Sequence, residues 1–108
     1  MSGDLLLTSC DTLRMIRVTF LYPKTDESTF DMDYYTSTHM PMLAAALGDD
    51  CQSWGADKIT SGQYEAIGWA LVSSAEPFGA ATETGAISAD VANYTNVRPD
   101  VVMGDVVR

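Results

Sequence analysis

The chain has few of the residues that most often build metal and nucleic-acid sites. It has one histidine and two cysteines in 108 residues, and fifteen Asp and Glu outnumber six Lys and Arg. A net charge of −9 repels nucleic acid and anionic membranes. One histidine, with Cys10 and Cys51 in unlike contexts, gives neither a ligand cluster nor a disulfide framework. We therefore predict no metal, no nucleic-acid partner, reduced thiols and a cytoplasmic protein.

Two further absences narrow the class of protein. No stretch approaches the roughly 20 apolar residues of a membrane-spanning helix, so we expect no membrane partner. No glycine-rich loop follows a strand pattern, which argues against a nucleotide cofactor. Apolar residues still make up 46% of the chain, enough for the core of one domain. We predict a flexible leader over residues 1–14 and one domain over residues 15–108.

Hydrophobic periodicity predicts the element order βαββαβ. Asp31 is a candidate N-cap, Phe30 can pack on Tyr35 as a hydrophobic staple, and Gly48 is a C-terminal stop. Pro41 should bend this first helix just after His39. The expected strands are 15–22, 52–59, 64–72 and 100–107; the helices are 32–47 and a second one opened by a Ser73/Glu76 capping box and ending near 85, with a helical turn near 88–91.

The strand at 64–72 is apolar on both faces. Ile67, Trp69 and Leu71 alternate with Ala66, Ala70 and Val72, and strand 100–107 behaves likewise. Two helices cover only one face of a four-stranded sheet, whereas a sheet that is apolar on both faces needs cover on both. We predict an α+β ferredoxin-like βαββαβ sandwich with a four-stranded antiparallel sheet. The simplest cover for the second face is another copy, so we predict a homodimer.

Residues 30–41 carry the strongest functional signal. His39 follows Tyr35 by one helical turn, so the two side chains share a face. Histidine titrates near neutral pH, which makes this pair a candidate catalytic site. His39 would act as general acid/base, and Tyr35 would position it or donate to a developing oxyanion. The alternative is a structural histidine; in either case, carbonyls freed at the Pro41 bend can bond the ring.

A pocket between the first helix and the sheet would be lined by aromatic rings. Asn93 and Tyr94 lie in an irregular segment, where polar groups can close the mouth of a pocket. Core packing or turn chemistry is the alternative for each position. The candidate ligand-binding residues are Phe20, Tyr34, Met42, Trp69, Asn93 and Tyr94.

Three motifs resemble the EthD family of small dimeric α/β-barrel proteins. They are residues 18–23 (VTFLYP), residues 30–35 (FDMDYY) followed by 39–41 (HMP), and residues 92–95 (ANYT), and the resemblance covers residues 15–107. It implies a homodimeric ferredoxin-like barrel and leans towards oxidoreductase chemistry. The family is named after a protein of bacterial ether degradation. Similar folds include cofactor-free monooxygenases, lactone isomerases, polyketide cyclases and some haem enzymes.

We therefore expect an EthD-like protein that binds a compact apolar organic molecule between the first helix and the sheet. Its chemistry would be cofactor-free acid/base or oxidative, in a catabolic or biosynthetic pathway. A non-catalytic ligand-binding or accessory protein of an oxygenase system is the alternative, so the protein's being an enzyme (oxidoreductase, isomerase or cyclase) stays open. A haem-binding member with the single histidine as axial ligand is the lesser alternative.

Overall fold

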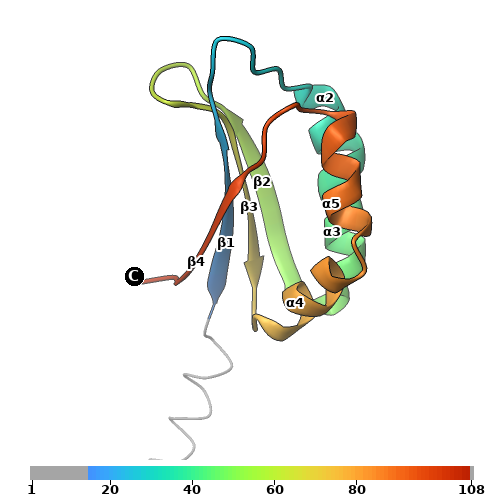
Figure 1. The fold of residues 1–108 in the computed structure, drawn as a ribbon. Coiled ribbons are helices and arrows are strands. Elements are labelled where there is room, and N and C mark those ends of the chain that lie inside the picture. The colour runs from blue at the N-terminus through green and yellow to red at the C-terminus, as the bar shows by residue number, and fades with distance from the viewer. Residues whose placement is uncertain (1–14, 108) are drawn as a thin grey trace, which may run out of the picture.

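A computed structural model describes residues 15–107; the expected leader at 1–14 and Cys10 lie outside the described residues. Helices lie on one side of a twisted sheet (Figure 1), and the predicted βαββαβ order is confirmed. The strands are β1 (Ile16–Pro23), β2 (Cys51–Lys58), β3 (Tyr64–Val72) and β4 (Asp100–Asp105). The helical segments are α2 (Met32–Tyr34), a π-helical turn (Tyr35–His39), α3 (Met40–Leu47), α4 (Glu76–Glu83), α5 (Ala86–Asp90) and 3-10 turns at Gly48–Asp50 and Val91–Asn93.

The strand order is β2-β3-β1-β4 and every pairing is antiparallel. This order, with both crossovers on one side, is the predicted ferredoxin-like α+β fold. β1 and β3 are central, and β2 is an edge strand. In β1, Val18, Phe20 and Tyr22 point into the helical layer and are buried, whereas alternate residues face away.

Small residues on β3 let the first helix approach the sheet closely. Ala66 and Ala70 are buried, and Gly68 lies directly beneath the hydroxyl of Tyr35. A Cβ at Gly68 would overlap that hydroxyl, so glycine is required by the contact. The helix is therefore fixed on the sheet at the position of the π-helical turn.

The start and end of the first helical region are as the sequence predicts. The Asp31 carboxylate accepts a 3.0 Å hydrogen bond from the Tyr34 N–H, and the Phe30 and Tyr35 ring centroids are 4.9 Å apart. Gly48 ends α3 at φ +64°. A π-helical turn lies just before the position of the expected bend, and in it the Met40 N–H donates to the Tyr35 carbonyl five residues earlier. Pro41 follows in the first turn of α3.

The predicted start of the second helix is wrong. α4 begins at Glu76 after Ala75, without a side-chain cap, and the Ser73 hydroxyl donates to the Asp50 carboxylate instead. The Ser73 side chain thus links the end of β3 to the turn before β2. The turn expected near 88–91 is a longer element, α5 plus a 3-10 turn, and β4 ends at Asp105. Val106 still donates from its N–H to the Met15 carbonyl.

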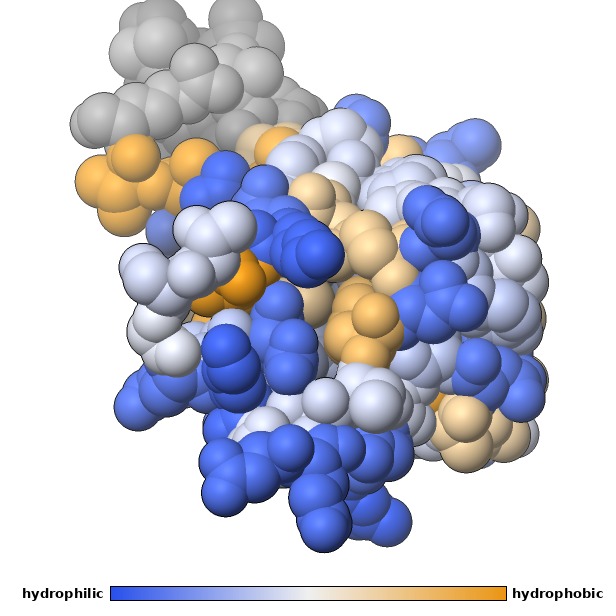
Figure 2. Space-filling model, turned by 90° about the horizontal axis from the view of Figure 1, so that it is seen from above, coloured by the Kyte–Doolittle hydropathy of each residue, from blue (hydrophilic) through white to orange (hydrophobic). Residues whose placement is uncertain are grey.

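The helix-free face of the sheet is apolar but open. Ile67, Trp69 and Leu71 of β3 are half-buried there, and Val102 of β4, which Thr19 of β1 separates from Trp69, is 51% exposed. The end of the molecule with the β1–α2 and β2–β3 loops is mostly hydrophilic, with a narrower apolar strip (Figure 2). Within residues 15–107, no helix is long and apolar enough to cross a membrane.

Candidate functional site

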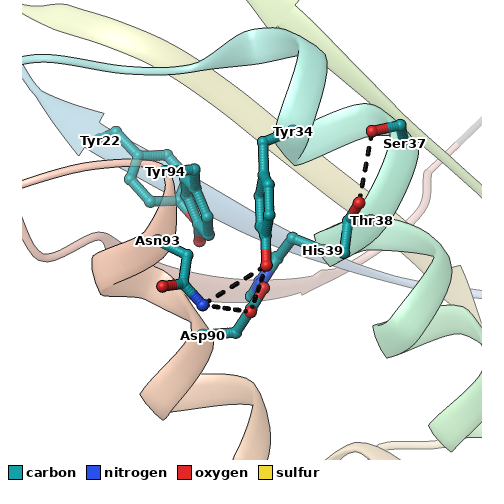
Figure 3. A network of polar contacts seen from close by, with 8 residues as sticks. All are labelled: Tyr22, Tyr34, Ser37, Thr38, His39, Asp90, Asn93 and Tyr94. Atoms are coloured by element: carbon teal, nitrogen blue, oxygen red, sulfur yellow. Dashed lines mark hydrogen bonds and ion pairs between the residues drawn. The ribbon is translucent and has the colours of Figure 1, made fainter.

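Four polar side chains from the two helical regions meet on the covered side of the sheet (Figure 3). Tyr34 ends α2 and His39 ends the π-helical turn; Asp90 ends α5 and Asn93 lies in the 3-10 turn that follows. The π-helical turn places Tyr34 and His39 so that both side chains reach Asp90, 56 and 51 residues further along the chain. The site therefore depends on how α5 lies against the first helix.

Asp90 is the centre of this network. Its Oδ2 lies 2.9 Å from His39 Nδ1, and its Oδ1 accepts hydrogen bonds from the Tyr34 hydroxyl at 2.7 Å and Asn93 Nδ2 at 2.9 Å. Asn93 Nδ2 also lies 3.4 Å from the Tyr34 hydroxyl oxygen. The carboxylate thus has a donor for each oxygen, which holds it in one orientation.

The electrostatics of the pair define its protonation state. Burial lowers the pKa of His39, outweighing the opposing effect of Asp90. Burial alone would raise the pKa of Asp90, but hydrogen bonds from Tyr34, Asn93 and His39 lower it. At neutral pH a neutral imidazole therefore donates from Nδ1 to a carboxylate, and the Nε2 lone pair is free to accept a proton. Nε2 has no hydrogen bond to any of residues 15–107.

Aromatic rings enclose the imidazole. The Tyr35 ring is nearly parallel to it with centroids 5.5 Å apart, and the Tyr94 centroid lies 4.6 Å away. The Tyr94 hydroxyl is 2.7 Å from that of Tyr22. Burial raises the pKa of all three phenols, so they are neutral hydrogen-bonding groups. The Tyr35 hydroxyl, buried on Gly68, has no hydrogen-bond partner among the described residues.

The structure brings together five of the eight residues predicted for the site, namely Tyr34, Tyr35, His39, Asn93 and Tyr94. Phe20 packs in the core against Phe78, with ring centroids 5.9 Å apart. Met42 lines a groove between α3 and the α4–α5 region. Trp69 lies on the opposite face of the sheet, beneath the Arg17 guanidinium.

Asp90 is the residue that sequence reasoning missed. The expectation that a freed backbone carbonyl holds the His39 ring is wrong, because the Asp90 carboxylate bonds Nδ1. A partial signal was present, since Asp90 lies in the helical turn expected near 88–91, three residues before the candidate residue Asn93. Nothing local in the sequence joins that segment to His39.

The space between the first helix and the sheet holds the packed rings of Tyr22, Phe30, Tyr35 and Tyr94. Beside them a surface hollow of about 390 Å³ is bounded by Phe30, Asn93 and Tyr94, and His39 does not line it. Tyr94 therefore lies between this hollow and the imidazole. Among the described residues, no group of His, Cys, Asp and Glu is arranged to hold a metal.

No protein-family profile matches the sequence, and no curated protein matches it. The solved structure of an EthD-like protein from Ralstonia eutropha is 38% identical, with a TM-score of 0.77, over 87% of this chain and 93% of that one. The chain belongs to the EthD-like family. The resemblance seen in the three sequence motifs is thus confirmed.

This EthD-like chain also shares its fold with a more distant protein. An ethyl tert-butyl ether D (EthD) family protein from Bacillus halodurans is 14% identical, with a TM-score of 0.63, over 86% of this chain and 99% of that one. A protein from Bacteroides fragilis, described as dimeric and ferredoxin-like, is 9% identical with a TM-score of 0.48, over 86% and 96% of the two chains.

Proposed function

We propose that this EthD-like protein transfers protons to and from a compact apolar organic molecule, with His39 as general acid/base and Asp90 as its positioning residue. The observation that supports this most directly is the 2.9 Å contact of His39 Nδ1 with Asp90, which leaves Nε2 as the free basic atom. An oriented, neutral imidazole is the form that removes a proton near neutral pH. Asp90 would stabilise the imidazolium that forms.

The aromatic residues would hold the substrate. Its apolar body would enter from the hollow at Asn93 and Tyr94, displacing the Tyr94 ring to reach Nε2. Tyr35, stacked on the imidazole, would keep the ring in place.

Haem chemistry receives no support from these residues. Tyr35 and Tyr94 pack against the His39 ring with centroids 5.5 Å and 4.6 Å away, and the ring is 4% exposed. A porphyrin coordinated at Nε2 is far larger than the compact molecule proposed above and needs an open slot beside the ring, so the residues present do not fit a haem.

A homodimer is part of the proposal. The half-buried Ile67, Trp69 and Leu71 of β3 form an apolar surface on the helix-free face, and the exposed Val102 of β4 lies on the same face beyond Thr19 of β1. A second copy packed on this face would remove that surface from water, and the covered side carrying His39 would remain accessible.

Carbon–hydrogen exchange tests the acid/base role without knowledge of the product. We would incubate the protein in D₂O with small enolisable ketones, such as 2-tetralone, and follow deuterium incorporation by NMR. His39→Gln should slow exchange by about 10²–10⁴-fold, the usual contribution of a general acid/base. Ser37→Ala, an exposed change on the same turn, should leave the rate unchanged.

A non-catalytic binding protein is the second candidate, favoured by the 4% exposure of His39. It predicts ketone binding in native mass spectrometry without exchange above the buffer rate. Ketone binding without deuterium exchange in the wild-type protein would therefore show a binding protein and contradict the proposed enzyme.

A further inference from the structure

The helical layer does not extend over β4. Val101 and Met103 lie opposite Phe20 and Val18 of β1, so their side chains point to the helix-covered side of the sheet. Phe20 and Val18 are buried, whereas Val101 is 48% exposed and Met103 is 47% exposed. The covered side of the sheet therefore has an apolar margin that no helix reaches.

Part of this margin forms the wall of a hollow of about 670 Å³. It lies between β4, the end of α5 and the segment that joins them, on the side of α5 away from α3. Val91, Val97, Pro99 and Val101 supply apolar surface to it. The volume is within the range of about 300–1,000 Å³ typical of small-molecule sites.

One wall of the hollow is held rigidly. The Thr95 hydroxyl donates to the Thr29 carbonyl at 2.6 Å, and the Asn96 side chain accepts from the Thr29 N–H at 2.9 Å and donates to the Glu27 carbonyl at 2.8 Å. These bonds tie the segment to the β1–α2 loop. Their polar groups are thus already satisfied, and the wall is preorganised.

Arg98 supplies the charge of the hollow. It forms no ion pair with any of residues 15–107, and no Asp or Glu is among the residues that line the hollow. By contrast, Lys58 shares its own hollow with Asp31, Asp33 and Glu65. In a chain of net charge −9, this combination of a free guanidinium and apolar surface is electrostatically distinctive.

We propose that this hollow binds an apolar organic acid, with the carboxylate on Arg98 and the hydrocarbon on Val91, Val97 and Val101. A guanidinium presents a planar pair of donors that matches a carboxylate, and the exposed Ser88 hydroxyl at the rim is a further donor. The site adjoins the His39–Asp90 network through α5 but contains neither residue. The inference goes beyond the proposed acid/base role and does not depend on it.

Octanoate and its neutral counterpart octanamide separate the charge contact with Arg98 from the apolar contact with the valines. In calorimetry at low salt, the protein should bind octanoate at least about ten-fold more tightly than octanamide, because only octanoate carries the charge. Arg98→Gln should remove that difference, whereas Lys24→Gln, an exposed charge change elsewhere, should keep it. Val101→Ser should weaken both compounds.

Backbone amide shifts in ¹H–¹⁵N spectra locate the ligand. Shifts within residues 88–101 support the site, and shifts centred on Trp69 place the acid on the helix-free face and overturn it. Equal affinity for the two compounds, no binding of octanoate, or unchanged octanoate affinity in a folded Arg98→Gln protein would each overturn it as well. His39→Gln should bind octanoate normally, so failure of the acid/base proposal leaves this result intact.

Discussion

The two faces of the sheet use the same alternating strands in different ways. On the covered face, Val18, Ala66, Ala70 and Val72 are at most 1% exposed, and even the polar His39 is enclosed. On the other face, Ile67, Trp69 and Leu71 of the same central strand β3 have only partial cover. Apolar patterning alone therefore does not distinguish a sheet face that is covered within the chain from one that is left open. The packing above each face distinguishes them.

The steric difference between the two faces should give the largest change in stability. Gly68→Ala on the covered face should lower the free energy of unfolding by about 2–3 kcal/mol, because its Cβ overlaps the buried Tyr35 hydroxyl. Gly104→Ala is the matched control, since nothing lies within 4 Å of a Cβ there and Gly104 pairs with Arg17 on the open face. Urea unfolding of both proteins measures the contrast, and equal stabilities would show that the helix can move away.

A charge on the open face tests whether a second copy covers it. Trp69→Asp should raise the dissociation constant of the dimer about 30-fold or more, equivalent to about 2 kcal/mol, because an unpaired carboxylate would be buried between the sheets. Light scattering over a dilution series gives the constant. Ala45→Asp, exposed on α3, adds the same charge to the helical layer and should leave assembly unchanged. A wild-type protein that is monomeric at low micromolar concentration would end the dimer proposal.

Asp90→Asn probes the polar network of the covered side. The loss of the carboxylate should destabilise the fold by about 1–2 kcal/mol, since Tyr34 and Asn93 lose a charged acceptor. It should also lower the pKa of His39 further, because Asp90 is what opposes the effect of burial. NMR titration of the imidazole measures the pKa. Asp100→Asn, an exposed acid on β4, is the control, and an unchanged His39 pKa in Asp90→Asn would contradict the assigned pairing.

The smallest expected effect is a pH dependence of stability. Burial lowers the pKa of His39 below its ordinary value of 6.5, so the unfolded chain binds the proton first as the pH falls. The contribution of neutral His39 to the free energy of unfolding is complete above about pH 6.5 and is lost as the pH falls through the folded-state pKa of His39. Unfolding midpoints compared between pH 7.5 and 5.5 at one protein concentration should show this decline. His39→Gln should flatten this decline. If the unfolding midpoint of His39→Gln fell with pH as steeply as that of the wild-type protein, His39 would not be the cause.

Much of the fold was predictable because its signals are local. The alternation of β3, the Asp31 cap and the contact of Phe30 with Tyr35 involve residues within a few positions of one another. The Ser73 cap failed because Asp50, distant in sequence, competes for the same hydroxyl. Asp90 was not predictable as the partner of His39 for the same reason, since the contact depends on how α5 packs on the first helix.

The π-helical turn Tyr35–His39 has a consequence for how relatives are aligned. It contains one residue more than an α-helical turn would, as the bond from the Met40 N–H to the Tyr35 carbonyl shows. One residue corresponds to about 100° of rotation in an α-helix. A homologue with a regular helix here would need a one-residue gap between the positions of Asp31 and Pro41. If that gap were misplaced, the column that holds His39 would show a different residue, and a shared histidine would be overlooked.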